Sequence, residues 1–159
     1  MSALFIAPHP DDETLWGSYI IMNYKADVAV FVDDKTPIET KLECGAACGI
    51  LGVTNLSFIT KIEQCKKAYQ WIFVPYPEGG HKWHDEVSKL AGDYFTEWKL
   101  KYYMAYGPDK TKPPAGRVKI PASAVMEEIK LRALACYKSQ HKDAAVHFKL
   151  KSKAEWLFN

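Results

Sequence analysis

Four short apolar runs, rich in β-branched and aromatic residues, most constrain what this chain can fold into. They are Ala3–Ala7, Val28–Val32, Leu56–Thr60 and Trp71–Val74. Runs of this length and composition are typical of buried strands, and the segments between them carry helical spacing or helix punctuation. Strands that alternate with helices predict an α/β protein with a parallel sheet. A length of 159 residues fits one domain, so we expect residues 1–159 to form a single unit.

The segments between and after these runs predict the helices. Thr36-Pro37-Ile38-Glu39 has the composition of a capping box with proline at the first helical position, and Gly52 is a stop signal, so we expect a helix over about 37–51. An earlier helix is expected to begin near Asp11–Glu13 and to run towards Tyr24. The remaining expectations are helices over about 85–100 and 122–137, short strands at 102–106 and 118–120, and a loop over 108–116.

The segment Pro8-His9-Pro10-Asp11-Asp12-Glu13 directly follows the first apolar run. The carboxyl end of a strand is where α/β sheets place their functional groups. His9 and Asp12, three positions apart, can hold one divalent ion, while Asp11 is left free to accept a proton. The acids could instead cap a helix, and His9 could simply end a strand. Capping alone leaves unexplained why one proline-stiffened turn holds a histidine and two aspartates, so a metal site is the stronger hypothesis.

A second segment, Gly79-Gly80-His81-Lys82-Trp83-His84, supplies two more histidines. It follows the fourth apolar run through a stretch of prolines and glycines, so we expect both histidines on or just after a loop. Hydrolytic zinc sites use three protein ligands and leave one position for water. His9, Asp12 and one of these two histidines complete such a set, and the other histidine is then available for catalysis. The spacing does not decide which histidine takes which role.

Together the two segments resemble the PIG-L/LmbE-type de-N-acetylases, zinc enzymes that remove an acetyl group from N-acetylglucosamine-like substrates. The resemblance implies a single-domain, Rossmann-like three-layer sandwich with a mostly parallel sheet. It also implies Zn²⁺ or a similar divalent metal on His9, Asp12 and His84, with Asp11 as general base. His81 is then the group that stabilises the oxyanion and donates a proton. The implied substrate is an N-acyl, most simply N-acetyl, derivative of an amino-sugar-like or other small or carrier-linked amine.

Two later patterns extend the resemblance over nearly the whole chain. Glu43, Ala47, Leu51 and Gly52 follow an E-x3-A-x3-L-G pattern, and Lys130, Ala133, Leu134, Ser139 and Gln140 follow a K-x-x-A-L…S-Q pattern. Three positions depart from the family. Thr40 stands where an arginine is frequent in the family. Trp83 stands where an aspartate is frequent just before the second histidine, and Tyr137 stands where a histidine is frequent. These departures predict altered contacts around the metal and a substrate other than inositol-linked N-acetylglucosamine.

Composition limits the binding partners and the cellular compartment that we expect for this protein. The chain has 21 Lys and Arg against 19 Asp and Glu, a formal charge of +2, so direct nucleic-acid binding is not expected. No run approaches the roughly 18 apolar residues of a membrane span, and the first residues do not resemble a leader, so we expect a cytoplasmic protein. The four cysteines have no C-x-x-C spacing and are expected to be buried or free thiols, with Cys44 and Cys48 on one helix.

Two other functional classes compete with the enzyme. One is a catalytically silent metal-binding or ligand-binding domain of the same fold, and the other is an α/β module that binds nucleic acid. Asp11 argues against the first, because a silent scaffold has no use for a buried free carboxylate. The near-balanced charge argues against the second. A zinc-dependent deacetylase is therefore the leading prediction from the sequence.

Overall fold

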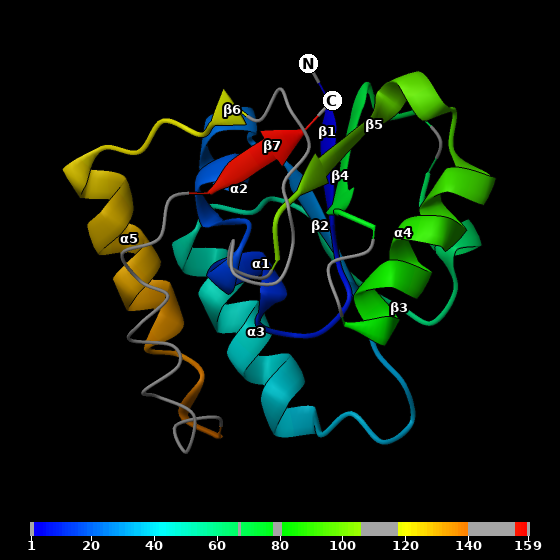
Figure 1. Ribbon diagram of the computed structural model, residues 1–159. Helices are drawn as coiled ribbons and strands as arrows, with labels where there is room; N and C mark the ends of the chain where they lie inside the picture. The colour runs from blue at the N-terminus through cyan, green and yellow to red at the C-terminus, as the bar shows by residue number, and fades with distance from the viewer. Residues whose placement is uncertain (1, 67, 78–80, 106–117, 140–154, 159) are drawn as a thin grey trace.

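The protein is built on a central sheet (Figure 1). The computed structural model describes residues 2–66, 68–77, 81–105, 118–139 and 155–158, and all strand and helix counts below refer to them. Five parallel strands lie in the order β3 (Leu56–Ile59), β2 (Asp27–Phe31), β1 (Ala3–Ala7), β4 (Trp71–Pro75) and β5 (Leu100–Tyr103). Two antiparallel strands, β7 (Trp156–Phe158) and β6 (Val118–Lys119), extend the sheet beyond β5. The predicted α/β fold with a mostly parallel sheet is confirmed.

Every residue of the central strand β1 is buried, which explains its continuous apolar sequence. In the ladder, Phe5 lies opposite Val28 of β2 on one side and opposite Phe73 of β4 on the other. Successive side chains point to opposite faces of a strand. Phe5 therefore packs into the core on one face of the sheet, and its neighbours Leu4 and Ile6 pack into the core on the other.

Helices cover both faces of the sheet and complete a three-layer sandwich. One face is covered by α1 (Asp12–Leu15), α2 (Ser18–Tyr24), α3 (Ile38–Ile50) and α5 (Ala124–Leu134). The other face is covered by α4 (Lys82–Tyr94) and the short 3₁₀ helix η1 (Ile62–Gln64). Figure 1 shows α4 on the opposite side of the sheet from α3 and α5.

The order of the parallel strands reverses between β1 and β4. From β1 the chain moves outward through β2 to β3, and it then returns to the other side of β1 to begin β4. In open α/β sheets, ligands bind in the crevice at the carboxyl ends of the strands that flank such a reversal. The segments that follow β1 and β4 are the two that carry the predicted metal ligands.

The single helix expected from Asp11 to Tyr24 is wrong, because the chain breaks it into α1 and α2 at Trp16 and Gly17. A methyl group added at Gly17 would lie 2.4 Å from Cζ of Phe5 and 2.9 Å from the carbonyl oxygen of Glu13. Gly17 therefore packs directly against the Phe5 ring and the Glu13 carbonyl, and a Cβ atom there would force one of them to shift.

The prediction of a helix over about 85–100 is also wrong at both ends. Helix α4 begins at Lys82 and ends at Tyr94, and the short 3₁₀ helix η2 (Glu97–Lys99) separates it from β5. Leu100 pairs with Ile72 of β4, so strand pairing in the sheet overrides the helical spacing of these residues. The strand expected at 102–106 accordingly begins at Leu100.

The expected capping box at Thr36 does not form. Helix α3 begins at Ile38 with Pro37 as its N-cap, and no side chain caps it. The Thr36 hydroxyl instead donates to Oδ1 of Asp33 at 2.8 Å, which keeps both residues in the turn before the helix.

The helix that we expect to begin at about 122 begins at Ala124, with Ser123 as its N-cap. The hydroxyl of Ser123 accepts a hydrogen bond from the backbone N–H of Met126 at 3.2 Å. The loop expected over 108–116 lies outside the described residues.

A buried ion pair between Lys130 of α5 and Glu155, the residue just before β7, contacts the junction between α1 and α2. Lys130 Nζ lies 2.7 Å from Oε1 of Glu155 and donates to the carbonyl oxygen of Leu15 at 2.9 Å. The second carboxylate oxygen of Glu155 accepts from the backbone N–H groups of Tyr19 at 2.8 Å and Ile20 at 3.2 Å. Burial raises the pKa of Glu155, and the positive charge of Lys130 opposes that shift. Each charge therefore needs the other to remain buried.

Replacing Gly17 by Ala tests the close approach to β1. We expect Gly17→Ala to lower the free energy of unfolding by about 1–3 kcal/mol, because the new methyl group displaces the Phe5 ring in a filled core. The matched control is Gly45→Ala on α3, where a Cβ atom meets nothing within 4 Å and alanine favours the helix by up to about 1 kcal/mol. Urea unfolding followed by circular dichroism measures the free energy of unfolding of both variants. Equal stability of Gly17→Ala and the parent protein would contradict this account.

Candidate metal centre

The fold brings the two predicted motifs together at the carboxyl end of the sheet. Pro8 to Asp11 form the turn between β1 and α1, and Asp12 is the first residue of α1. His81 is the N-cap of α4, and His84 lies in the first turn of that helix. The two segments follow neighbouring strands of the reversal, so their side chains meet although about seventy residues separate them in the sequence.

Three of the predicted residues place their donor atoms side by side. Oδ2 of Asp12 lies 3.1 Å from Nδ1 of His9 and 3.1 Å from Nε2 of His84. The two histidine nitrogens lie 3.3 Å from each other. The backbone N–H of His9 also donates to the same oxygen of Asp12 at 2.9 Å. Two nitrogens and one oxygen therefore form the corners of a nearly equilateral triangle, which we call the His9–Asp12–His84 triad.

The spacing of the triad fits a small divalent ion. Two ligands of a tetrahedral zinc ion, at bond lengths of about 2.0–2.1 Å, lie about 3.3–3.4 Å apart. All three donor atoms of the triad are close to that separation from one another. Two imidazoles and one carboxylate also match the composition of catalytic zinc sites, which use three protein ligands. His9 is 42 % exposed at its side chain, so the triad is open on one side.

The buried carboxylate of Asp12 is held in its charged form. Burial by itself would raise the pKa of Asp12, but hydrogen bonding to His84 and His9, together with their charges, outweighs burial and lowers the pKa to about 2. A carboxylate that is ionised at neutral pH is the form that binds a metal. Asp12 is therefore ready to act as a ligand without first losing a proton.

Asp11 lies beside the triad but does not belong to it. Its backbone is in a strained conformation, with φ 128° and ψ −28°, which residues other than glycine rarely adopt. The backbone N–H donates to Oε2 of Glu13 at 2.9 Å. Burial and the charges of Asp12 and Glu13 raise the pKa of the Asp11 carboxyl well above its ordinary value. A carboxylate with a raised pKa is a stronger base, as the predicted role requires.

His81 borders the triad from the start of α4. Its ring lies edge to face with the rings of His9 and His84, at centroid distances of 5.2 Å and 4.8 Å. Burial and the neighbouring charges of His84 and His9 lower the pKa of His81, and Asp12 and Asp85 partly oppose this shift. The neutral form of the imidazole is therefore favoured at a lower pH than for a histidine in water. Lys82, next to His81, is exposed.

Beneath this turn lies Glu13, which the sequence interpretation treated only as a helix-capping acid. It is fully buried, and its carboxylate accepts hydrogen bonds from the hydroxyls of Thr14 at 2.7 Å and Tyr137, as well as from the backbone of Asp11. Burial raises the pKa of Glu13, while these hydrogen bonds lower it. Tyr137, noted in the sequence only as a departure from the family, thus reaches from the segment after α5 to support the turn that holds Asp11.

Glu13, Cys44 and Cys48 form a second group of closely spaced potential ligands. The oxygens of Glu13 already accept hydrogen bonds from protein donors. The hydrogen bond with Cys48, and then burial, raises the pKa of the Cys44 thiol, so it stays protonated at neutral pH. Metal ligation requires the thiolate. The pair is better explained as core packing, and both cysteines are buried free thiols, as the sequence predicts.

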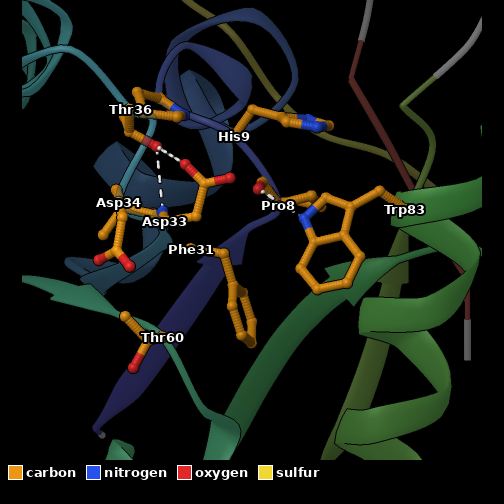
Figure 2. A pocket seen from close by; sticks show the side chains of 10 residues that line it. Pro8, His9, Phe31, Asp33, Asp34, Thr36, Thr60 and Trp83 are labelled. Carbon is orange, nitrogen blue, oxygen red and sulfur yellow. Dashed lines mark hydrogen bonds between the residues drawn. The ribbon is translucent and has the colours of Figure 1, made fainter.

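A cavity of about 500 Å³ opens next to His9 (Figure 2). It lies between the turn after β1, the loop after β2 and the first turn of α4. Its lining residues are Pro8, His9, Pro10, Phe31, Val32, Asp33, Asp34, Thr36, Thr60 and Trp83. Sequence reasoning missed the contribution of the loop after β2, although its position at the carboxyl end of the strand next to β1 is a usable signal.

Comparisons with known proteins bear on the fold. No protein-family model matches the sequence, and a comparison with curated proteins finds no match. Among solved structures, the conserved protein TT1542 from Thermus thermophilus is similar, with a TM-score of 0.67 and 18% sequence identity. The similarity covers 93% of this chain and 84% of that chain. At this identity the similarity shows that the two share the fold, a Rossmann-like α/β sandwich.

None of the helices in the described residues has the length and apolar character that crossing a membrane requires.

Two substitutions at Asp11 separate the charge of its carboxyl from the strain of its backbone. Asp11→Asn removes a carboxylate whose pKa is raised in the folded state, so it should stabilise the protein at neutral pH, where folding penalises the ionised form. Asp11→Gly removes the same charge and also relieves the strain at φ 128°, which should add about 1–2 kcal/mol. Urea unfolding at pH 5 and pH 8 measures both effects. Glycine and asparagine variants of equal stability would show that this backbone is not strained.

Proposed function

We propose that this chain is a metal-dependent amide hydrolase of the PIG-L/LmbE type that removes a short N-acyl group, most simply acetyl, from an amine. The observation that carries the proposal is the His9–Asp12–His84 triad, three donor atoms spaced for one ion at the reversal of the sheet. Asp11 and His81, the two groups that the resemblance assigns to proton transfer, flank this triad. The placement of all five residues supports hydrolysis over a purely structural metal site.

The reaction can be described from the side chains present. A divalent ion on His9, Asp12 and His84 would supply Lewis-acid chemistry, polarising an amide carbonyl and lowering the pKa of water. Asp11, with its raised pKa, accepts a proton from the attacking water. Oxygen adds to the carbonyl carbon, the C–N bond breaks, and the amine leaves with a proton. In the proposed reaction His81, whose ring borders the triad, donates a hydrogen bond to the oxyanion and, in its protonated form, a proton to the amine.

No acyl-enzyme is needed in this scheme. Cys44 and Cys48, the described cysteines that lie close to Glu13, are on the buried side of α3 and do not line the cavity, and the Cys44 thiol is held protonated because its pKa is raised. A nucleophilic serine or cysteine needs an adjacent base and access to the substrate. Direct attack by water therefore fits the residues around the triad. The products are a free amine and a short carboxylate.

Metal analysis of variants tests the ligand set. We expect the purified protein to bind about one zinc or similar divalent ion, and His9→Ala, Asp12→Ala and His84→Ala each to lose most of it, because three ligands are needed. Asp11→Asn should keep the metal and lose about 10²-fold or more in turnover. Asp93→Ala is the matched control, since Asp93 is exposed at the opposite end of α4.

The readouts are elemental analysis and mass spectrometry of a panel of N-acetyl amines that includes N-acetylglucosamine glycosides and their inositol-linked form. Unchanged metal in all three ligand variants would overturn the site. Full metal occupancy with no turnover on any member of the panel would favour a catalytically silent metal-binding domain over an enzyme. Strong preference for the inositol-linked sugar would contradict the expectation drawn from Thr40.

The pH dependence of turnover tests His81. If protonated His81 stabilises the oxyanion, kcat/KM falls as pH rises and removes that proton, and the lowered pKa places this fall below the usual titration range of histidine. His81→Ala should retain the metal, lose the alkaline limb and slow turnover by roughly 10²–10³-fold. Lys82→Ala is a control at the neighbouring exposed position. A variant that matched the parent at every pH would remove His81 from the mechanism.

A further inference from the structure

The cavity beside His9 offers far more room than an acetyl group requires. Its volume of about 500 Å³ falls within the range of roughly 300–1,000 Å³ that is usual for small-molecule sites. His9 is both a member of the triad and a lining residue, so the cavity adjoins the triad at His9. A substrate whose amide lies at the triad can extend past His9 into this cavity, where the lining residues would contact it.

One wall is a fixed aromatic ring. The indole N–H of Trp83 donates to the carbonyl oxygen of Pro8 at 3.0 Å, and the ring packs edge to face against the buried Phe31 at a centroid distance of 5.6 Å. Trp83 is nevertheless 37% exposed. Figure 2 shows the indole nitrogen of Trp83 pointing to Pro8, with Phe31 beside the ring. A ring that is fixed before a ligand arrives loses little conformational entropy on binding.

The loop after β2 forms an acidic wall. Asp33 and Asp34 both line the cavity and both are exposed. Oδ1 of Asp33 accepts from the Thr36 hydroxyl at 2.8 Å and from the backbone N–H of Lys35 at 3.0 Å, which fixes the carboxylate. These hydrogen bonds, the first of them foremost, lower the pKa of Asp33, so it is charged at neutral pH. Among the described residues that line the cavity there is no lysine or arginine.

Taking the proposed function as its basis, we propose that this cavity selects N-acyl amines that carry a second, positively charged amine, with the ammonium group between the Trp83 ring and the carboxylates of Asp33 and Asp34. A tryptophan face attracts a cation through the quadrupole of the ring, and carboxylates attract it through charge. Lys35, on the same loop, lies close enough to influence Asp33 electrostatically and opposes this attraction. A mono-N-acetylated diamine is the simplest molecule with the required chemistry.

Calorimetric titration of the zinc-loaded protein with mono-N-acetyl diamines of three to eight methylene groups tests the proposal without relying on turnover. Each diamine is compared with its isostere in which a hydroxyl replaces the second amine. We expect the best diamine to bind roughly five- to tenfold more tightly than its isostere at low salt, and this preference to shrink as salt screens the carboxylates.

Three variants test which side chains produce the preference for the diamine over its isostere. Asp33→Asn combined with Asp34→Asn should abolish the preference for the amine, and Trp83→Leu should reduce that preference, because only the charged amine is attracted by the ring. Lys35→Gln should increase the preference, because it removes the competing positive charge. Opposite responses to the asparagine and glutamine substitutions cannot arise from a general loss of folding.

Equal binding of diamine and isostere by the parent protein would overturn the proposal, as would a preference that survives the double asparagine substitution. Failure of every probe to bind would overturn it as well. A preference that follows this pattern without any hydrolysis of the acetyl group would support the cation site and count against the proposed amide hydrolase. Hydrolysis of neutral N-acetyl amines without such a preference would support the enzyme and reject the cation site.

Discussion

The carboxylate of Asp12 connects two parts of the chain that the sheet only brings near each other. One of its oxygens contacts His9 from the turn after β1 and His84 from the first turn of α4, all within hydrogen-bonding distance. A buried charge is costly unless it is paired, so this carboxylate requires both imidazoles in place. The start of α1 and the start of α4 are thereby held in one arrangement. The geometry of the candidate site follows from that requirement together with the reversal of strand order at β1 and β4.

A second buried acid supports the same turn from below. Glu13 accepts hydrogen bonds from the backbone of Asp11 and from the hydroxyl of Tyr137, which lies just after α5. Strained backbone persists only where its surroundings determine it strongly, and residues held in this way cluster at functional sites. Here the backbone N–H of Asp11 is held by Glu13, and the charge of Asp12 lies close by. Burial, followed by the charges of Asp12 and Glu13, raises the pKa of Asp11, so the turn that strains this residue also makes it a better base.

Much of the fold could be predicted from the sequence because it depends on local pattern. The four apolar runs correspond to β1 to β4, since strands buried on both faces need continuous apolar residues. The errors lie where distant contacts decide local structure. The ring of Phe5 leaves little room for a side chain at Gly17, between α1 and α2, and pairing with β4 makes Leu100 a strand residue after a helix that ends at Tyr94. Neither neighbour can be recognised from the residues on either side of these positions.

The candidate site, like the fold, could be predicted from the sequence only in part. The sequence by itself determined which residues could hold a metal, because the spacing of His9 and Asp12 and the positions after two apolar runs are local properties. Only the tertiary structure decided that their donor atoms meet those of His84 within about 3.3 Å, because the strand order places β4 beside β1. It also decided that Glu13 is a buried support and that Asp33 faces a cavity. An acidic side chain has the same chemistry in either place, and whether it is buried and paired or exposed and free depends on residues that are distant in the sequence.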